Sequence, residues 1–141
     1  MPAKATLWVP IDGSDCALRA LRYASRRFRQ GGYQAIVALN VQMAMSPSAL
    51  VTRQMIRTHQ HNMSEEALAP ARALAARLKV PLTCQVLDGD PARAIIRSAS
   101  KARGDEIIMG TRGLGRVGGL LMGSVATKVV QLAPVPVTLI K

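Results

Sequence analysis

Short apolar runs alternate with helix-like segments along the whole chain, and this alternation limits the possible folds more than any other feature. The runs typical of buried strands cover residues 6–11, 35–41, 82–87, 106–109 and 135–140. Strands that alternate with helices pair in parallel through right-handed crossovers, and their helices cover both faces of the sheet. We therefore expect one α/β domain over residues 1–141, built on an open, doubly wound, five-stranded parallel sheet.

Two of the helical segments carry clear start signals. After the first strand, Ser14 or Asp12 suits the N-cap of a helix that has one apolar face and an opposite face rich in arginine. Later in the chain, Asp90 followed by Pro91 combines an N-cap carboxylate with proline at the first helical position. These signals place both helices directly after strands, as a doubly wound fold requires.

Residues 42–80 give a less clear pattern. We expect a loop and then a helix from about residue 49, while two glutamates favour a helix start near residue 64. Pro70 interrupts the apolar stripe and predicts a kink or a break. One bent helix and two separate helices are both compatible with this segment.

The composition excludes some classes of protein and leaves others open. Hydrophobic residues make up 49% of the chain but aromatic residues only 3%, which suits aliphatic packing of helices on a parallel sheet. The formal net charge of +11 favours anionic partners, such as nucleotides, nucleic acid or acidic surfaces. Cys16 and Cys84 form no paired motif and are expected as core thiols. Because no leader segment or membrane-length apolar run occurs, we expect a cytoplasmic protein without a membrane partner.

Residues 107–124 join the fourth apolar run to the last helical segment through a loop rich in glycine. Six glycines fall among the fourteen residues 110–123. Glycine lets the backbone approach a ligand closely, and a helix N-terminus offers free N–H groups with a partial positive charge. A strand, a glycine loop and a helix start in this order indicate an anion site, most often one for phosphate.

Two familiar phosphate motifs fit this loop poorly. The dinucleotide fingerprint matches residues 113–118, but this match follows the fourth strand rather than the first. No acidic residue occurs after Glu106, so the carboxylate that should bind ribose is missing. Residues 118–124 match a Walker A pattern without its lysine, so a P-loop NTPase is not expected.

A third pattern, in which Gly110 and Gly113 are followed after nine residues by Gly123 and Ser124, resembles the ATP-binding branch of the universal stress protein family. Further segments that are similar to the family cover residues 9–14, 89–95, 105–113, 123–126 and 133–137. The resemblance is weakest over residues 42–80. It implies a Rossmann-like sheet with the strand order 3-2-1-4-5 and helices on both faces.

The resemblance also implies how a nucleotide is held. Asp12 would bond the adenosine end, and the backbone of Val41 would contact adenine with Pro10 nearby. The loop would lie against ribose and α-phosphate, and the start of the last helix would hold the β- and γ-phosphates. The implied binding residues are Pro10, Asp12, Val41, Met109, Gly110, Thr111, Arg112, Gly113, Gly123, Ser124 and Val125. The implied cofactor is ATP or another adenine nucleotide with Mg²⁺ or Mn²⁺, and the implied assembly is a homodimer through the strand from Val135 to Ile140.

No catalytic or metal-binding residue is expected. The Gly-x-Ser-x-Gly nucleophile motif does not occur, and His59 and His61 would point to different faces of a helix. The sequence therefore favours a stress-response module in which bound ATP changes the order of the loop and the surface offered to a protein partner. One alternative is a weak ATPase or nucleotidyl transferase. The other alternative is a protein that binds nucleic acid or acidic partners through a basic surface. Nucleic acid is not favoured as the partner, because aromatic residues that could stack on bases are scarce. The candidate contact residues are Arg19, Arg22, Arg26 and Arg29.

Overall fold

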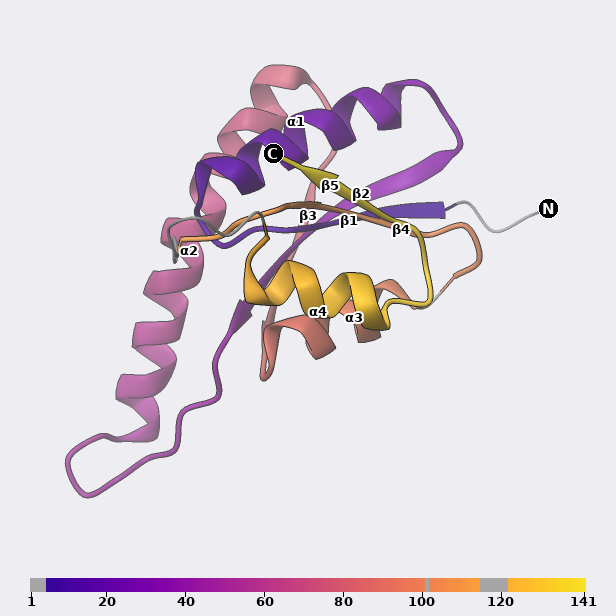
Figure 1. The fold of residues 1–141 in the computed structure, drawn as a ribbon. Coiled ribbons are helices and arrows are strands. Elements are labelled where there is room, and N and C mark those ends of the chain that lie inside the picture. Colours follow the sequence, from indigo (N-terminus) through magenta and orange to yellow (C-terminus); the bar gives the residue numbers. More distant parts are fainter. Residues whose placement is uncertain (1–4, 101, 115–121) are drawn as a thin grey trace.

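The computed structural model describes residues 5–100, 102–114 and 122–141 and shows a five-stranded parallel sheet with the strand order β3-β2-β1-β4-β5. In chain order the elements are β1 (Ala5–Pro10), α1 (Asp15–Arg29), β2 (Tyr33–Gln42), α2 (Arg53–Leu78), β3 (Thr83–Asp88), α3 (Pro91–Ala99), β4 (Glu106–Gly110), α4 (Ser124–Leu132) and β5 (Val137–Ile140). Helices α1 and α2 cover one face of the sheet, and α3 and α4 cover the other (Figure 1). The expected fold class and strand order are confirmed, and the strand ends differ from the expected runs by at most two residues.

The core lies on both faces of the sheet because neighbouring residues of β1 point to opposite sides. On the side of α1 and α2, Leu7 packs in one cluster with Leu21 and Leu68, all fully buried. On the side of α3 and α4, Trp8 and Ile95 belong to a second cluster. The sheet is therefore covered on both faces, and its strand ends remain as the place where a ligand can enter.

A buried carboxylate ties β1 to the start of β4. Asp105 is 1% exposed, and its Oδ1 accepts a hydrogen bond of 2.8 Å from the backbone N–H of Thr6. Its Oδ2 accepts a bond of 2.9 Å from the indole Nε1 of Trp8. With both oxygens bonded, Asp105 holds the two central strands in the arrangement that brings their carboxyl ends together.

The segment between β2 and β3 differs most from the sequence expectation. Helix α2 is one continuous helix from Arg53 to Leu78, so the expected helix starts near residues 49 and 64 were wrong. The helix begins where it does because the side chain of Thr52 accepts a bond from the N–H of Met55. Pro70 is accommodated inside the helix because it is exposed, and water can bond the carbonyl that its missing N–H leaves free.

Candidate functional site

A cavity of about 320 Å³ opens at the carboxyl ends of the central strands, between β1, β2, β4 and the starts of α3 and α4. This is the edge of a doubly wound sheet at which ligands bind. The structure brings all of the residues predicted to bind nucleotide to the lining of this cavity: Pro10, Asp12, Val41, Met109, Gly110, Thr111, Arg112, Gly113, Gly123, Ser124 and Val125. Their individual binding roles remain predictions.

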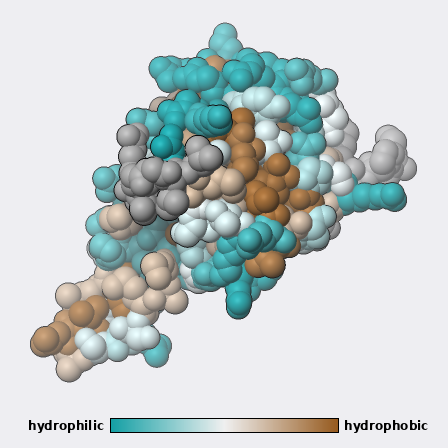
Figure 2. All heavy atoms as spheres, in the orientation of Figure 1, coloured by the Kyte–Doolittle hydropathy of each residue, from teal (hydrophilic) through white to brown (hydrophobic). Residues whose placement is uncertain are grey.

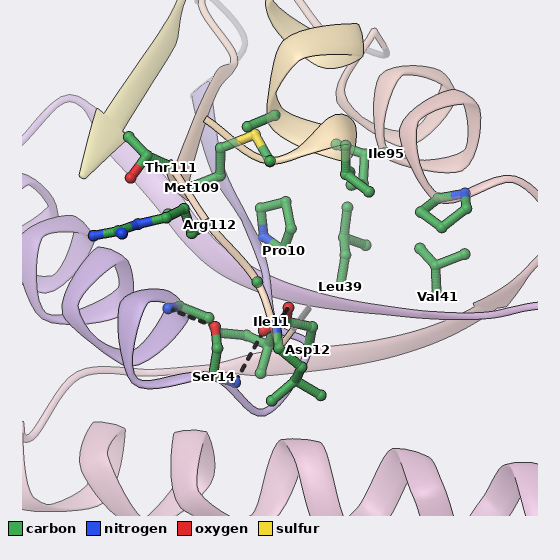
Figure 3. A pocket seen from close by; sticks show the side chains of 18 of the residues that line it. Pro10, Ile11, Asp12, Ser14, Leu39, Val41, Ile95, Met109, Thr111 and Arg112 are labelled. Carbon is green, nitrogen blue, oxygen red and sulfur yellow. Dashed lines mark hydrogen bonds between the residues drawn. The ribbon is translucent and has the colours of Figure 1, made fainter. Parts of the chain in front are cut away.

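One side of the cavity is an apolar wall that the sequence analysis found only in part. Figure 3 shows Leu39 and Ile95 beside the predicted Pro10 and Val41. The signal for Leu39 was present in the sequence, since it lies two residues before Val41 and therefore on the same face of β2. Ile95 comes from the inward face of α3. Together these side chains form a surface suited to one face of a flat, largely apolar ring.

Asp12 lies at the end of β1 and is bonded to the glycine loop. Its Oδ1 accepts a bond of 2.9 Å from the N–H of Ser14, and its Oδ2 accepts one of 3.2 Å from the N–H of Leu114. The N-cap of α1 is Ser14, whose hydroxyl accepts a bond of 3.2 Å from the N–H of Ala17. Since Ser14 takes the capping role, the exposed carboxylate of Asp12 is left to connect β1 with the loop after β4.

The glycines of the site differ in what the protein itself requires of them. A Cβ at Gly110 would lie 2.8 Å from the Sγ and 3.0 Å from the Cβ of Cys16, and a Cβ at Gly113 would lie 2.3 Å from Oδ2 of Asp12. These two glycines permit close approaches within the folded chain. A Cβ at Gly123 would meet nothing nearer than 3.6 Å, so the packing of the protein does not demand glycine there.

The start of α4 faces the same cavity. Gly123 is the N-cap residue, and neither a side-chain cap nor an acidic residue in the first turn satisfies this helix end in the part of the chain that the structure describes. The N–H of Gly123 donates to the carbonyl of Thr111 at 2.7 Å, which anchors the helix start to the end of β4. The N–H groups that follow are the natural donors for an anion in the cavity.

Arg112 contributes its backbone to the lining more than its charge. Its side chain is exposed, and Figure 3 shows it directed away from the wall formed by Pro10, Leu39 and Val41. Nearby, Cys16 is buried, and its thiol donates to the carbonyl of Ile140 at 3.1 Å. Burial raises the pKa of this thiol, but hydrogen bonds involving Arg112 and Thr111 outweigh burial, so the pKa lies below its usual value. The cysteine is a buried thiol, as expected.

The cavity offers little to a bound metal ion. No group of three or more His, Cys, Asp or Glu side chains gathers within the described ranges, 5–100, 102–114 and 122–141. Of the cavity-lining residues, Asp12 supplies one carboxylate, and Ser14, Thr111 and Ser124 supply hydroxyl groups. A divalent ion would fit there only with most of its ligands provided by phosphate oxygens and water.

Comparison with known proteins identifies the family. A family model described as the universal stress protein family matches residues 6–141. The chain belongs to the universal stress protein family. Two curated members support this: a universal stress protein of Methanocaldococcus jannaschii is 32% identical over 136 residues, with 94% of this chain and 79% of the relative covered. One of Thermus aquaticus is 34% identical over 137 residues, with 96% and 98% covered.

Solved universal stress proteins share the fold. One from Archaeoglobus fulgidus, in complex with dAMP, has a TM-score of 0.71 at 22% identity and covers 100% of both chains. One in complex with cAMP has a TM-score of 0.70 at 21% identity, with 97% of each chain covered. One from Arabidopsis thaliana, with AMP bound, has a TM-score of 0.67 at 21% identity, with 97% and 91% covered.

Proposed function

We propose that this universal stress protein binds an adenine nucleotide in the cavity at the strand ends, with ATP as the favoured ligand. The observation that carries the proposal is the pairing of two unlike surfaces within one cavity. An apolar wall that includes Leu39 and Val41 lies on one side, and the uncapped start of α4 at Gly123 lies on the other. A nucleotide has the matching chemistry, with a flat base at one end and phosphates at the other.

Each part of the nucleotide has a place in this proposal. The base lies against the wall, and Val41 contacts it through backbone groups. The ribose lies near Asp12, whose carboxylate exchanges its bond with the N–H of Leu114 for one with a sugar hydroxyl. The phosphates lie at the N–H groups of Ser124 and Val125. The complexes of the three related structures with AMP, dAMP and cAMP support an adenine nucleotide as the class of ligand.

The protein acts as a regulatory module in this proposal rather than as an enzyme. Binding pulls Asp12 away from Leu114, and therefore changes the loop after β4 and the surface that it presents. Mg²⁺ or Mn²⁺ accompanies the triphosphate and is held mainly by phosphate oxygens. We also propose a homodimer, because β5 is an edge strand and Val130 and Leu132 on the preceding helix are exposed. A cytoplasmic location remains a prediction from the sequence.

The arginine face of α1 does not carry a competing proposal. Arg19, Arg22, Arg26 and Arg29 are all exposed, as a binder of nucleic acid would need. Three of them already have partners within the protein. Arg19 donates to the carbonyl of Lys141 at 2.8 Å, Arg26 lies over the ring of Tyr23, and Arg29 donates to a backbone carbonyl at the end of α2. A solvated basic face accounts for them.

Mass spectrometry of small molecules released from freshly purified protein tests the identity of the ligand. The proposal predicts an adenine nucleotide in the released fraction, or tight binding when ATP is added to the stripped protein. Titration with ATP, ADP, AMP and GTP then ranks the phosphate length and the base. A stripped, folded protein that binds none of the adenine nucleotides at millimolar concentration would contradict the proposal.

A further inference from the structure

A second feature of the molecule is an arm, defined here as residues 43–63, which extends away from the sheet (Figure 1). It consists of the segment after β2 and the first turns of α2. Internal bonds hold it in shape: the hydroxyl of Ser48 accepts from the N–H groups of Leu50 and Val51, and Gln60 donates to the carbonyl of Met43 at 3.1 Å. The arm is therefore a formed structure that projects from the body of the protein.

The arm carries large apolar side chains that the rest of the chain leaves uncovered, and two of them, Leu50 and Met55, lie beside the start of α2. Leu50 is 87% exposed, Met43 73%, Met55 54% and Met45 49%. Figure 2 shows this end of the molecule as a hydrophobic tip that is separate from the hydrophilic surface over α1. Apolar groups gathered at a projecting tip mark a contact surface more often than scattered exposed residues do.

The positive charge of the arm favours a negatively charged partner. The arm contains Arg53 and Arg57 and no acidic residue, and no Asp or Glu occurs between residues 16 and 64. The negative charge must therefore come from the partner. A second copy of the chain is a poor source, because its net charge is also +11. Three of its few carboxylates are already paired with basic residues, namely Glu65, Asp90 and Glu106.

The form of the tip favours a partner without fixed polar geometry. Methionine side chains adapt their shape to what they meet. The hydroxyl of Ser48 and the N–H groups near it are bonded to one another rather than directed outward. The partner must therefore carry negative charge and accept apolar side chains without fixed polar contacts. An anionic phospholipid bilayer does both, because its acyl chains accept the apolar tip and its phosphates attract the basic residues behind the tip.

We propose that the arm is a peripheral docking element for anionic phospholipid membranes. Leu50 and Met55 enter the boundary between headgroups and acyl chains, while Arg53 and Arg57 lie at the phosphates. The expectation that the protein has no membrane partner depended on the absence of an apolar run long enough to span a bilayer, and this proposal corrects it. Among the described residues no helix has the length and apolar character to cross a bilayer, and surface docking does not require one. The arm acts independently of the nucleotide cavity.

Vesicle partition of the full-length protein tests the proposal. Wild-type protein should float with vesicles of phosphatidylglycerol and phosphatidylcholine, less with phosphatidylcholine alone, and less as salt rises. The double variant Leu50→Gln/Met55→Gln should lower the partition coefficient by roughly tenfold or more, given the size of the apolar surface withdrawn. Val86→Gln is the matched control, because Val86 is 48% exposed on the edge strand β3 and lies outside the arm.

A positively charged protein can also adhere to anionic vesicles without inserting any side chain, so insertion needs its own measurement. In Leu50→Trp, emission should shift to shorter wavelength with anionic vesicles, and brominated lipid should quench it. In Val86→Trp neither change should occur, and the buried Trp8 gives the same background in both. Arg53→Gln/Arg57→Gln should weaken binding more than Arg22→Gln/Arg26→Gln, which removes the same charge from α1.

Three outcomes would overturn the proposal. The first is the absence of wild-type binding to anionic vesicles at low salt. The second is unchanged binding of the Leu50→Gln/Met55→Gln variant, with its fold verified by circular dichroism and thermal unfolding. The third is a tryptophan at position 50 that stays solvent-exposed on bound vesicles. Binding of the tip to an acidic protein segment but not to lipid would belong to the first outcome.

Discussion

Alanine substitutions at Gly110, Gly113 and Gly123 should lower the free energy of unfolding to different extents, and Gly110→Ala should lower it most. Its new Cβ would lie 2.8 Å from the Sγ, 3.0 Å from the Cβ and 3.1 Å from the backbone carbon of Cys16. Because Cys16 is buried in the first turn of α1, it cannot move without disturbing the helix. Overpacking of this kind costs about 1–3 kcal/mol, offset by about 0.4–1 kcal/mol from the stiffer unfolded chain.

The other two positions should respond weakly. The new Cβ of Gly113→Ala would collide with the carboxylate of Asp12, which can rotate away. The hydrogen bond from the N–H of Leu114 is then lost, at a cost of about 1 kcal/mol. The lower conformational freedom of the unfolded chain offsets most of this cost. Gly123→Ala meets only ordinary contacts and should change the free energy of unfolding by less than about 0.5 kcal/mol. Urea unfolding of the three variants measures the series, with net losses of about 1–2 kcal/mol for Gly110→Ala alone.

A double-mutant cycle with Cys16 sharpens this prediction. Cys16→Ala removes the Sγ but leaves the Cβ and the backbone carbon, so it should relieve only part of the cost of Gly110→Ala. The reasoning fails if Gly110→Ala is as stable as Gly123→Ala, or if Gly110→Ala and Cys16→Ala are strictly additive.

Two further predictions concern carboxylates outside the cavity. Asp105→Asn should lower the free energy of unfolding by about 2–3 kcal/mol, because one buried donor of β1 would face the new amide N–H. Urea unfolding followed by the fluorescence of Trp8 measures this loss. An unchanged urea midpoint would contradict the prediction. The N–H of Arg93, and then the ammonium of Lys128, lower the pKa of Asp90 below its usual 3.8. The stability that the charge of Asp90 adds is therefore fully present above that value and lost as the pH falls through the lowered pKa. Asp90→Asn keeps an acceptor for the N–H of Arg93 but should remove this pH dependence. Acid unfolding curves of the same shape for the wild type and Asp90→Asn would contradict this.

The sequence predicted which residues meet at the cavity better than it predicted the segment between β2 and β3. Asp12 and Gly110 each follow an apolar run and Val41 ends one, and parallel pairing alone brings the ends of such runs to one edge of a sheet. The same logic could not separate Gly110 from Gly123, because only the folded chain shows that a Cβ at Gly110 would collide with Cys16 while a Cβ at Gly123 would make only ordinary contacts. The spacing of the glycines in the loop does not show which of the two is required by the packing of the chain.

The parts that could not be predicted depend on distant contacts. The start of α2 at Thr52 competes in sequence with other hydroxyl residues nearby, and its capping bond exists only once the chain has turned. The bond between Asp105 and Trp8 joins residues 97 positions apart, which no local pattern reveals. The exposure of Leu50 is likewise decided by the direction in which the arm leaves the sheet.

The most direct test of the nucleotide-binding proposal is a paired titration of ATP into wild-type protein and Gly123→Val by isothermal calorimetry. The folded chain has room for a Cβ at this position, so the valine methyl groups would occupy the space proposed for the phosphates without displacing the protein's own atoms. We predict saturable binding to the wild type, none to the variant, and thermal unfolding of the two free proteins that agrees to within about 1 kcal/mol. Equal affinity of both proteins for ATP, or no binding by the stripped wild type, would contradict the account.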